Sequence, residues 1–201
     1  VIGIEAGGWL SPRDFAPDEL RNGARNWPQS VQKAASEAPT VRANSNQKAV
    51  QGGHPMMNAV GGTTMHYWAQ SWRLNPWDFK VVSATRDRYG ADRIPTGSTV
   101  EDWPFGYDEL EPYYEKVEFA VGISGQAGNV KGKINTTGNV FEGERQSEYP
   151  MRPLRTSPFT ELMTNAAQRL DWSPFQGPAA LTSELYDGRP SCQYHGFCTK
   201  G

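Results

Sequence analysis

Cys192 and Cys198 are the two cysteines of the chain, and their spacing allows only a few kinds of chemistry. They flank His195 in the segment Cys192-Gln-Tyr-His195-Gly-Phe-Cys198. Two thiols at this spacing can close a small disulfide loop, ligate a metal centre, or stay reduced on a loop. A four-ligand zinc or iron–sulfur centre needs more ligands than this pair supplies. The spacing alone leaves the three outcomes open.

Glu5 is the second candidate, because it follows the apolar run Val1-Ile-Gly-Ile and precedes Ala6 and Gly7. We read the run as a buried parallel strand that ends in a turn. Nucleotide-binding βαβ units place an acid at such a strand end, where it accepts hydrogen bonds from ribose hydroxyls. The matching glycine-rich loop is expected about 20 residues upstream, before residue 1. Taken alone, the feature favours an ordinary strand end with an exposed Glu5.

The segment Gly61-Gly62-Thr63-Thr64 has the composition of a loop that approaches a ligand closely. The backbone N–H groups of such a turn can point together at an anion, for example a pyrophosphate. Three residues that follow could border a planar ring, namely His66, Tyr67 and Trp68. The alternative is a glycine turn before a hydrophobic strand, with His66 as a buried imidazole.

Two helices are expected to support these segments. The first has Pro112 at its start and Gly122 at its end, with an apolar face of Tyr113, Tyr114, Val117, Ala120 and Val121. The second has Ser157 as its cap and Pro158 as its first residue. Its expected apolar face is Phe159, Leu162, Met163, Ala166, Ala167 and Leu170.

The rest of the chain shows mainly turn and loop signals. Residues 22–60 and 122–150 are expected to be mostly loop, and residues 76–100 carry turn chemistry. Gly122, Gly125 and Gly128 have the spacing G-x-x-G-x-x-G, but they follow a helix, so we read them as a helix end and a loop.

Composition excludes several classes. The formal net charge is -2 and the basic residues are scattered over the 201 residues, which argues against a nucleic-acid partner. No apolar run reaches the roughly 18 residues of a membrane span. The chain contains 21 Gly, 15 Pro and 7 Trp, which favours long ordered loops over a helical bundle. The length suits one domain or one and a half.

Several motifs together resemble the glucose–methanol–choline (GMC) oxidoreductases. Val1-Ile-Gly-Ile-Glu5-Ala-Gly7 is similar to their second strand, and Asn58-Ala-Val-Gly61-Gly62-Thr63-Thr64 to their signature loop. The segment from Asp102 to Tyr114 is similar to their "W-P, then Y-x-x-L-x-P-Y-Y" stretch. The segment from Tyr186 to Cys198 resembles the branch of gluconate and fructose dehydrogenases. His66 and Tyr67 depart from the common signature, which puts an aliphatic residue and Asn at those positions, and His66 resembles the sugar-dehydrogenase branch instead.

The resemblance implies an α/β fold: part of an FAD-binding Rossmann-like domain with long loop excursions and the start of a substrate domain. We expect residues 1–125 to form the flavin-binding portion and residues 126–201 to lead toward the substrate domain. The ten expected FAD-binding residues are Glu5, Ala6, Gly7, Gly61, Gly62, Thr63, Thr64, His66, Tyr67 and Trp68. The chain looks like an internal piece of such an enzyme, and the resemblance places no catalytic residue in it.

The resemblance also implies an activity and partners. The expected reaction is oxidation of a sugar, sugar acid or alcohol at a CH–OH group by an FAD-dependent dehydrogenase. The expected partners are a cytochrome c subunit that takes the electrons and a small helper subunit, in a periplasmic or membrane-associated complex. The alternatives are an oxygen-reducing sugar oxidase and a nonenzymatic carbohydrate-binding module.

Two covalent features follow from the same branch. His66 stands at the spacing after the glycine pair at which some members bond the flavin, so the resemblance implies a covalent link there. The alternative is a noncovalent His66 that packs near the flavin ring. Cys192 and Cys198 fit the first interval of a C-x5-C-x3-C iron–sulfur loop. The disulfide remains the competing prediction for these two residues.

Overall fold

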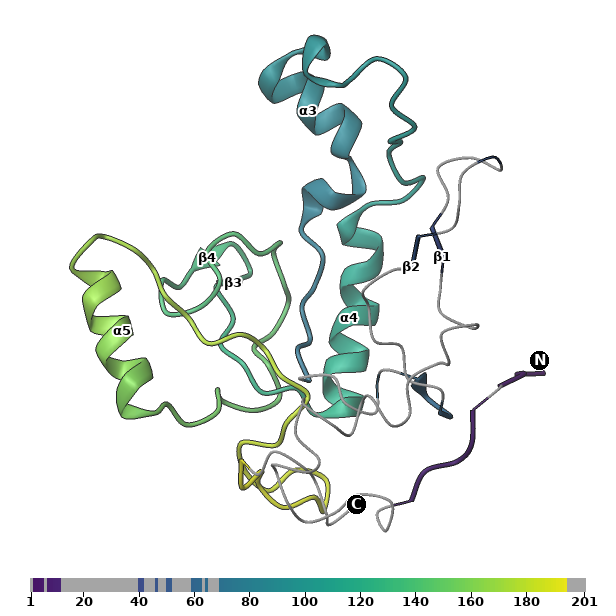
Figure 1. The fold of residues 1–201 in the computed structure, drawn as a ribbon. Helices are drawn as coiled ribbons and strands as arrows, with labels where there is room; N and C mark the ends of the chain where they lie inside the picture. Colours follow the sequence, from purple (N-terminus) through teal and green to yellow (C-terminus); the bar gives the residue numbers. More distant parts are fainter. Residues whose placement is uncertain are drawn as a thin grey trace. The chain divides into compact units, whose positions relative to one another are not determined.

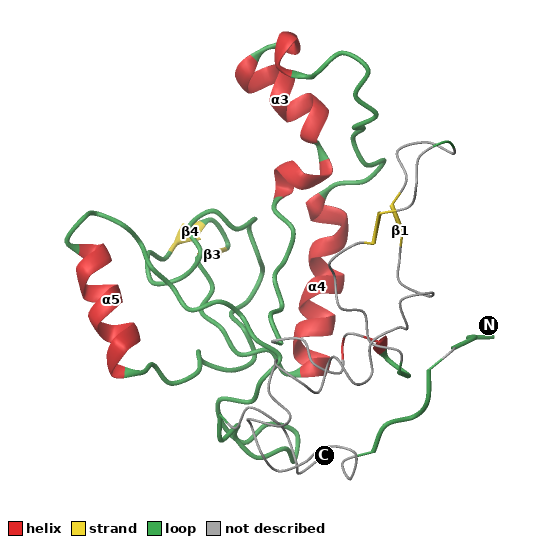
Figure 2. Cartoon of the chain, in the orientation of Figure 1, coloured by secondary structure: helices red, strands yellow, loops and turns green. Residues whose placement is uncertain are grey.

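The computed structural model describes residues 2–5, 7–11, 40–41, 46, 50–51, 59–62, 64 and 69–194. The chain divides into two compact units, one of Val1–Trp68 with Gln193–Gly201 and one of Ala69–Cys192. Helices and short antiparallel ladders make the described part a mixed α/β structure (Figures 1 and 2). The Rossmann-like domain and the division near residue 125 stay predictions.

The first unit contains one short ladder among its described residues. Strand β1 (Thr40–Val41) pairs with β2 (Val50–Gln51) in antiparallel orientation. The expected buried strand before Glu5 is not observed: Ile2 and Ile4 are 91% and 97% exposed and lie in no strand. A strand exists only where a neighbour shares its backbone hydrogen bonds, and residues 2–5 pair with no described segment.

In the second unit, residues 76–93 form helices where the sequence showed turn chemistry, and residues 94–100 form turns and irregular chain as expected. A 3-10 helix η3 (Pro76–Phe79) is followed by α3 (Val81–Tyr89) and a second 3-10 helix η4 (Ala91–Arg93). The Asp102 carboxylate accepts hydrogen bonds from the N–H groups of Val82 and Ser83, at 2.7 and 3.2 Å. These bonds satisfy orphan donors in the first turn of α3. The N-terminal cap therefore comes from a distant residue, and α3 buries no apolar stripe that periodicity could reveal.

Helix α4 (Tyr107–Val121) begins five residues before the expected start, so Pro112 lies inside it. Gly122 ends the helix as predicted, in a left-handed conformation with φ 79°. The expected apolar face is wrong: Tyr113 and Val117 are 63% and 58% exposed. The buried residues of α4 are Tyr107, Glu111 and Glu118.

After α4, residues 128–138 form a closed loop, meaning that its two ends lie against each other, and a tight hairpin lies within it. Strands β3 (Asn129–Val130) and β4 (Lys133–Ile134) pair antiparallel across a two-residue turn. At the base of the loop, Gly128 and Gly138 cross so closely that an added Cβ would lie 2.1 and 2.4 Å from the opposing backbone. The side of Gly125 is filled by the Tyr149 ring, so these glycines serve packing. The interpretation of Gly122, Gly125 and Gly128 as a helix end and a loop is confirmed.

Helix α5 (Pro158–Gln168) follows its predicted beginning. The Ser157 hydroxyl accepts a hydrogen bond from the Thr160 N–H at 3.1 Å, and Pro158 is the first helical residue. The helix ends before Leu170. Its expected apolar face is exposed, with Phe159 and Leu162 at 69% and 65% exposure.

A hairpin turn at residues 186–189 caps the end of α4. Tyr186 and Arg189 exchange two backbone hydrogen bonds across Asp187 and Gly188, whose positive φ angles of 47° and 74° are typical of a type I′ turn. The Tyr186 hydroxyl donates to the Phe119 carbonyl at 2.7 Å. The Arg189 guanidinium donates to the Val121 carbonyl at 2.7 Å. Both bonds satisfy carbonyls that a helix end leaves without intrahelical partners.

The apolar core of the second unit is small. Ile123, Ala127 and Tyr149 are buried together, and Val130 and Ala180 pack against them. Among the described residues, no helix is both long enough and apolar enough to span a membrane.

Candidate functional site

The turn after Glu5 is closed by its own side chain. The Glu5 carboxylate accepts a hydrogen bond from the Gly7 N–H at 2.8 Å. Glu5 itself is exposed, and Gly8 has no atom within 4 Å of the place where a Cβ would stand. The carboxylate and the backbone of this turn are therefore open to a ligand.

The glycine pair forms a second turn. Gly61 and Gly62 have φ angles of 90° and 55°, which a residue with a Cβ rarely adopts. The Gly62 N–H donates to the Ala59 carbonyl at 2.8 Å, and the Thr64 N–H and hydroxyl both donate to the Gly61 carbonyl. Open space lies beside Gly62, where an added Cβ would meet nothing within 4 Å.

The structure brings these two turns together within the first unit. Gly8 and Ala59 form a parallel bridge, and the Val60 N–H donates to the Gly8 carbonyl at 3.0 Å. The turn that carries Glu5 ends just before this bridge, and the turn that carries Gly62 begins at it. An exposed acid and a glycine turn connected through this bridge are groups of the kind expected at the ribose and pyrophosphate of a dinucleotide.

The remaining expected site residues lie outside the described residues. These are Ala6, Thr63, His66, Tyr67, Trp68 and Cys198. Their roles stay predictions.

Cys192 is half-buried and lies at the end of the segment 182–192, which is held together by hydrogen bonds. Its N–H donates to the Thr182 carbonyl at 2.8 Å, and the Thr182 hydroxyl donates to the Pro190 carbonyl at 2.7 Å. In the part of the chain that the structure describes, no group of three or more His, Cys, Asp and Glu side chains could hold a metal. Neither the iron–sulfur prediction nor the disulfide is tested by these residues.

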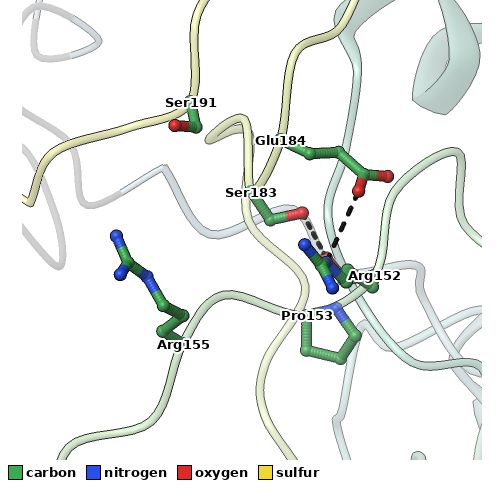
Figure 3. A pocket seen from close by; sticks show the side chains of 6 residues that line it. All are labelled: Arg152, Pro153, Arg155, Ser183, Glu184 and Ser191. Carbon is green, nitrogen blue, oxygen red and sulfur yellow. Dashed lines mark hydrogen bonds and ion pairs between the residues drawn. The ribbon is translucent and has the colours of Figure 1, made fainter.

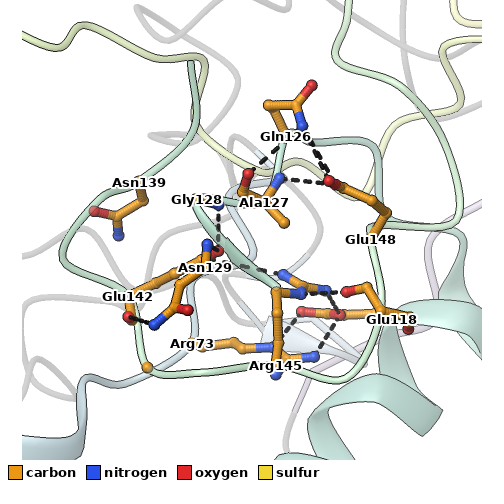
Figure 4. A network of polar contacts seen from close by, with 12 residues as sticks. Arg73, Glu118, Gln126, Ala127, Gly128, Asn129, Asn139, Glu142, Arg145 and Glu148 are labelled. Atoms are coloured by element: carbon orange, nitrogen blue, oxygen red, sulfur yellow. Dashed lines mark hydrogen bonds and ion pairs between the residues drawn. The ribbon is translucent and has the colours of Figure 1, made fainter. Parts of the chain in front are cut away.

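A buried network of charged side chains is the feature that sequence reasoning missed (Figure 4). Arg73 makes a bidentate ion pair with Glu118, at 2.7 and 2.8 Å, and also contacts Glu111 at 3.0 Å. Its Nη1 donates to the Tyr107 hydroxyl at 3.1 Å. Burial alone would lower the pKa of Arg73, but the hydrogen bonds and charge of Glu118 raise it well above its usual range.

Arg145 joins the same network from the other side. It is fully buried, donates to Glu118 at 2.5 Å, and lies 3.9 Å from Glu142. Its guanidinium stacks 3.8 Å from the centroid of the Tyr149 ring. Burial raises the pKa of the Tyr149 hydroxyl to about 12.

Glu142 binds the backbone of the closed loop. Its carboxylate accepts from the N–H groups of Gly128 and Asn129, at 2.5 and 3.1 Å. Burial raises the pKa of Glu142 above its usual value, while these two hydrogen bonds oppose the increase.

The network is a structural site, because each of its carboxylates already binds a guanidinium or a backbone N–H. Tyr107, Glu111, Tyr114 and Glu118 follow i, i+4, i+7, i+11 spacing along one face of α4. That spacing was the available signal, and two acids on it could have indicated arginine partners elsewhere in the chain.

Comparison with known proteins supports the resemblance found in the motifs. No family model matches the chain. The gluconate 2-dehydrogenase flavoprotein of Pantoea cypripedii is 28% identical over 225 residues, which cover 99% of this chain and 35% of that protein. The fructose dehydrogenase large subunit of Gluconobacter japonicus is 34% identical over 143 residues, covering 71% of this chain and 23% of that subunit.

An oxidase is among the similar proteins. The paromamine 6'-oxidase of Streptomyces fradiae is 27% identical over 139 residues, covering 69% of this chain and 22% of that protein. This chain thus spans about a third of the first relative and about a fifth of the other two. Their names agree with the family that the motifs indicated. The chain is therefore a GMC-type oxidoreductase homologue that corresponds to part of the length of these enzymes.

Proposed function

We propose that this chain supplies FAD-binding segments to an oxidoreductase that oxidises CH–OH groups of sugars, sugar acids or alcohols. The observation that carries the proposal is the pairing of Gly8 with Ala59, which sets the Glu5 turn beside the Gly61–Gly62 turn. The similarity to flavoprotein dehydrogenases supports it. These relatives favour an enzyme over a carbohydrate-binding module.

Each turn has a separate task in this proposal. When bound, FAD supplies the acceptor for the hydride that leaves the carbinol carbon. The Glu5 carboxylate accepts hydrogen bonds from the ribose hydroxyls. The Gly7 N–H donates to its Oε1 at 2.8 Å, and this bond fixes the orientation of the carboxylate. The open backbone at Gly62 allows the pyrophosphate to approach without a clash.

Flavin retention by the full-length protein tests the role of Glu5. Glu5→Ala removes charge-assisted hydrogen bonds worth about 1.5–3 kcal/mol each, so FAD is expected to dissociate during gel filtration. Glu101→Ala is the matched control, since Glu101 is an exposed acid in the other unit. The absorbance ratio of flavin to protein measures the outcome. Equal flavin content in both variants would show that Glu5 does not hold the ribose.

An oxygen-reducing oxidase is the second candidate, and the similarity to paromamine 6'-oxidase favours it. The dehydrogenase proposal includes a cytochrome c subunit as electron acceptor, a helper subunit and a periplasmic or membrane-associated complex. Oxygen consumption during turnover separates the two. Stoichiometric oxygen uptake with a sugar or alcohol supports the oxidase, and turnover that needs an added one-electron acceptor supports the dehydrogenase.

We further propose that His66 carries the flavin covalently and that Cys192 and Cys198 ligate an iron–sulfur cluster. Acid denaturation separates bound from free flavin. Yellow colour that remains on the polypeptide, and is lost in His66→Ala, supports the bond. Iron analysis with electron paramagnetic resonance tests the cluster, and active enzyme without iron would leave the disulfide as the better account of the cysteines.

A further inference from the structure

A pocket in the second unit is lined mainly by polar and charged residues (Figure 3). Its volume is about 350 Å³, within the range of small-molecule sites. The residues that line it are Arg152, Pro153, Arg155, Ser183, Glu184 and Ser191. They come from two segments far apart in the sequence, one before α5 and one around the 186–189 turn.

The first wall is anchored in the core. Met151 is buried, and its carbonyl accepts a hydrogen bond from the Gly125 N–H at 3.0 Å. Arg152 follows directly, and its own carbonyl accepts from the Ser183 hydroxyl at 2.6 Å. This bond joins the two walls at the base of the pocket. Pro153 further restricts the backbone of the first wall.

The second wall is anchored to α4. Its residues Ser183, Glu184 and Ser191 lie on either side of the turn whose Tyr186 and Arg189 cap the helix. The hydrogen bonds from Thr182 to Pro190 and from Cys192 to Thr182 tie the two arms of this segment together. Besides the Ser183–Arg152 bond, each wall is therefore held by contacts of residues outside the pocket.

The charge of the lining favours an anion. Two guanidinium groups face one carboxylate, so the lining has a net charge of +1. The Glu184 carboxylate forms an exposed ion pair with the Arg152 Nε at 3.4 Å. Arg155 stands across the pocket from Arg152 in Figure 3. Guanidinium groups only donate hydrogen bonds, and their fork matches the oxygens of carboxylate and phosphate.

We propose that this pocket binds a small oxyanion, a carboxylate or a phosphate group, between Arg152 and Arg155. Ser183 and Ser191 border the same space. The Ser183 hydroxyl already donates to the Arg152 carbonyl, so its oxygen can accept only from a hydroxyl or other donor group of such a ligand. The inference concerns residues that take no part in the proposed flavin site.

The test uses the full-length protein with its flavin bound and inorganic phosphate as the probe. Phenylglyoxal modifies accessible arginines, and mass spectrometry of peptides reports modification at each position. Phosphate is expected to protect Arg152 and Arg155 in a saturable manner at constant ionic strength, and to leave Arg169 unprotected. Arg169 is the control, because it is exposed and lies outside the pocket. Acetate competing for the same protection shows that carboxylates bind, and protection by phosphate alone identifies a phosphate site.

Variants sharpen the assignment. Arg155→Gln and Arg152→Gln are each expected to weaken phosphate binding, measured by equilibrium dialysis, by about tenfold to a hundredfold. Arg169→Gln should leave it unchanged. All three arginines are exposed, so the variants are expected to fold. The absence of saturable protection, or equal loss in all three variants, would overturn the proposal. Flavin content is measured in the same samples, so failure here is distinguishable from failure of the flavin proposal.

Discussion

Helices α4 and α5 were both predicted from sequence, yet they are stabilised in opposite ways. Helix α4 directs Tyr107, Glu111 and Glu118 into a buried network, and leaves Val117 exposed. Helix α5 has the better apolar pattern but buries none of its residues. Periodicity therefore predicts that a helix forms, but it does not say which face the rest of the molecule covers.

The difference between the two helices shows which interactions stabilise the second unit. Its buried apolar core is small, so the ion pairs of α4 carry a large part of the specificity of packing. A buried charge is costly unless it is paired, so each partner in this network depends on the others. Helix α5 depends instead on its own cap and its own backbone.

The largest expected effect comes from unpairing the α4 network. Glu118→Ala leaves the buried guanidiniums of Arg73 and Arg145 without their shared carboxylate, at a cost of about 3–5 kcal/mol. Hydrogen exchange of the α4 amides measures the loss as a lower free energy of opening. Asp108→Ala, an exposed acid on the same helix, is expected to change it by only a few tenths of a kcal/mol. Similar effects of the two variants would contradict the central role of the network.

A smaller effect is expected from Glu142, with a defined dependence on pH. Burial raises the folded-state pKa of Glu142 above the ordinary value of 4.5. At pH values between the two pKa values, the folded protein therefore holds a proton that the unfolded chain has released. The stability that Glu142 contributes is therefore present below pH 4.5 and is lost as pH rises through the raised pKa. Denaturant unfolding at a series of pH values measures it. Glu142→Gln should abolish this component, and an unchanged pH profile would show that the carboxylate titrates normally.

The cap on α4 should give an effect near 1 kcal/mol. Arg189→Ala removes the hydrogen bond to the Val121 carbonyl, which costs about 0.5–1.5 kcal/mol. Hydrogen exchange should increase in the last turn of α4 and remain unchanged in its first turn. Arg169→Ala serves as the exposed arginine control. Uniform exchange changes along the helix would argue against a local cap.

The smallest effect is expected on the apolar face of α5. Leu162→Ala should change the stability of the helix by less than about 0.5 kcal/mol, because Leu162 is 65% exposed. Ser157→Ala should cost more, about 1 kcal/mol, because it removes the N-terminal cap. Exchange of the α5 amides compares the two. A larger loss from Leu162→Ala would mean that this face is covered in the full-length protein.

Sequence reasoning succeeded where the signal was local. Ser157 and Pro158 specify the start of α5, and Gly122 specifies the end of α4, because capping depends on neighbours within a few residues. It failed where the partner was distant. Asp102 caps α3 from 20 residues away, and Arg73 pairs with Glu118 across 45 residues. The spacing of the acids on α4 indicates that they need partners, but it does not say which distant residues supply them.

The candidate site shows the same division. The glycine pair at Gly61 and Gly62 was identified from composition, and the structure gives both residues positive φ angles. The exposed state of Ile2 and Ile4 was not predicted, because a strand depends on a neighbour that a short apolar run does not reveal. The bridge between Gly8 and Ala59 was not anticipated either, since it joins segments 51 residues apart.

The crossing of Gly128 and Gly138 has a consequence for protein engineering. The two backbones touch where no side chain fits, and the Asn135 N–H donates to the Gly128 carbonyl at 2.8 Å, so the ends of this loop are fixed to each other. The tip of the hairpin at Lys131 and Gly132 lies beyond that junction. A chain inserted at such a tip has its ends already closed by the junction, and the entropy of added length grows only slowly. The Lys131 N–H donates to the carbonyl of the buried Arg145 at 2.9 Å, so a purification tag or a fluorescent reporter grafted at this tip should follow Gly132 and leave that bond in place.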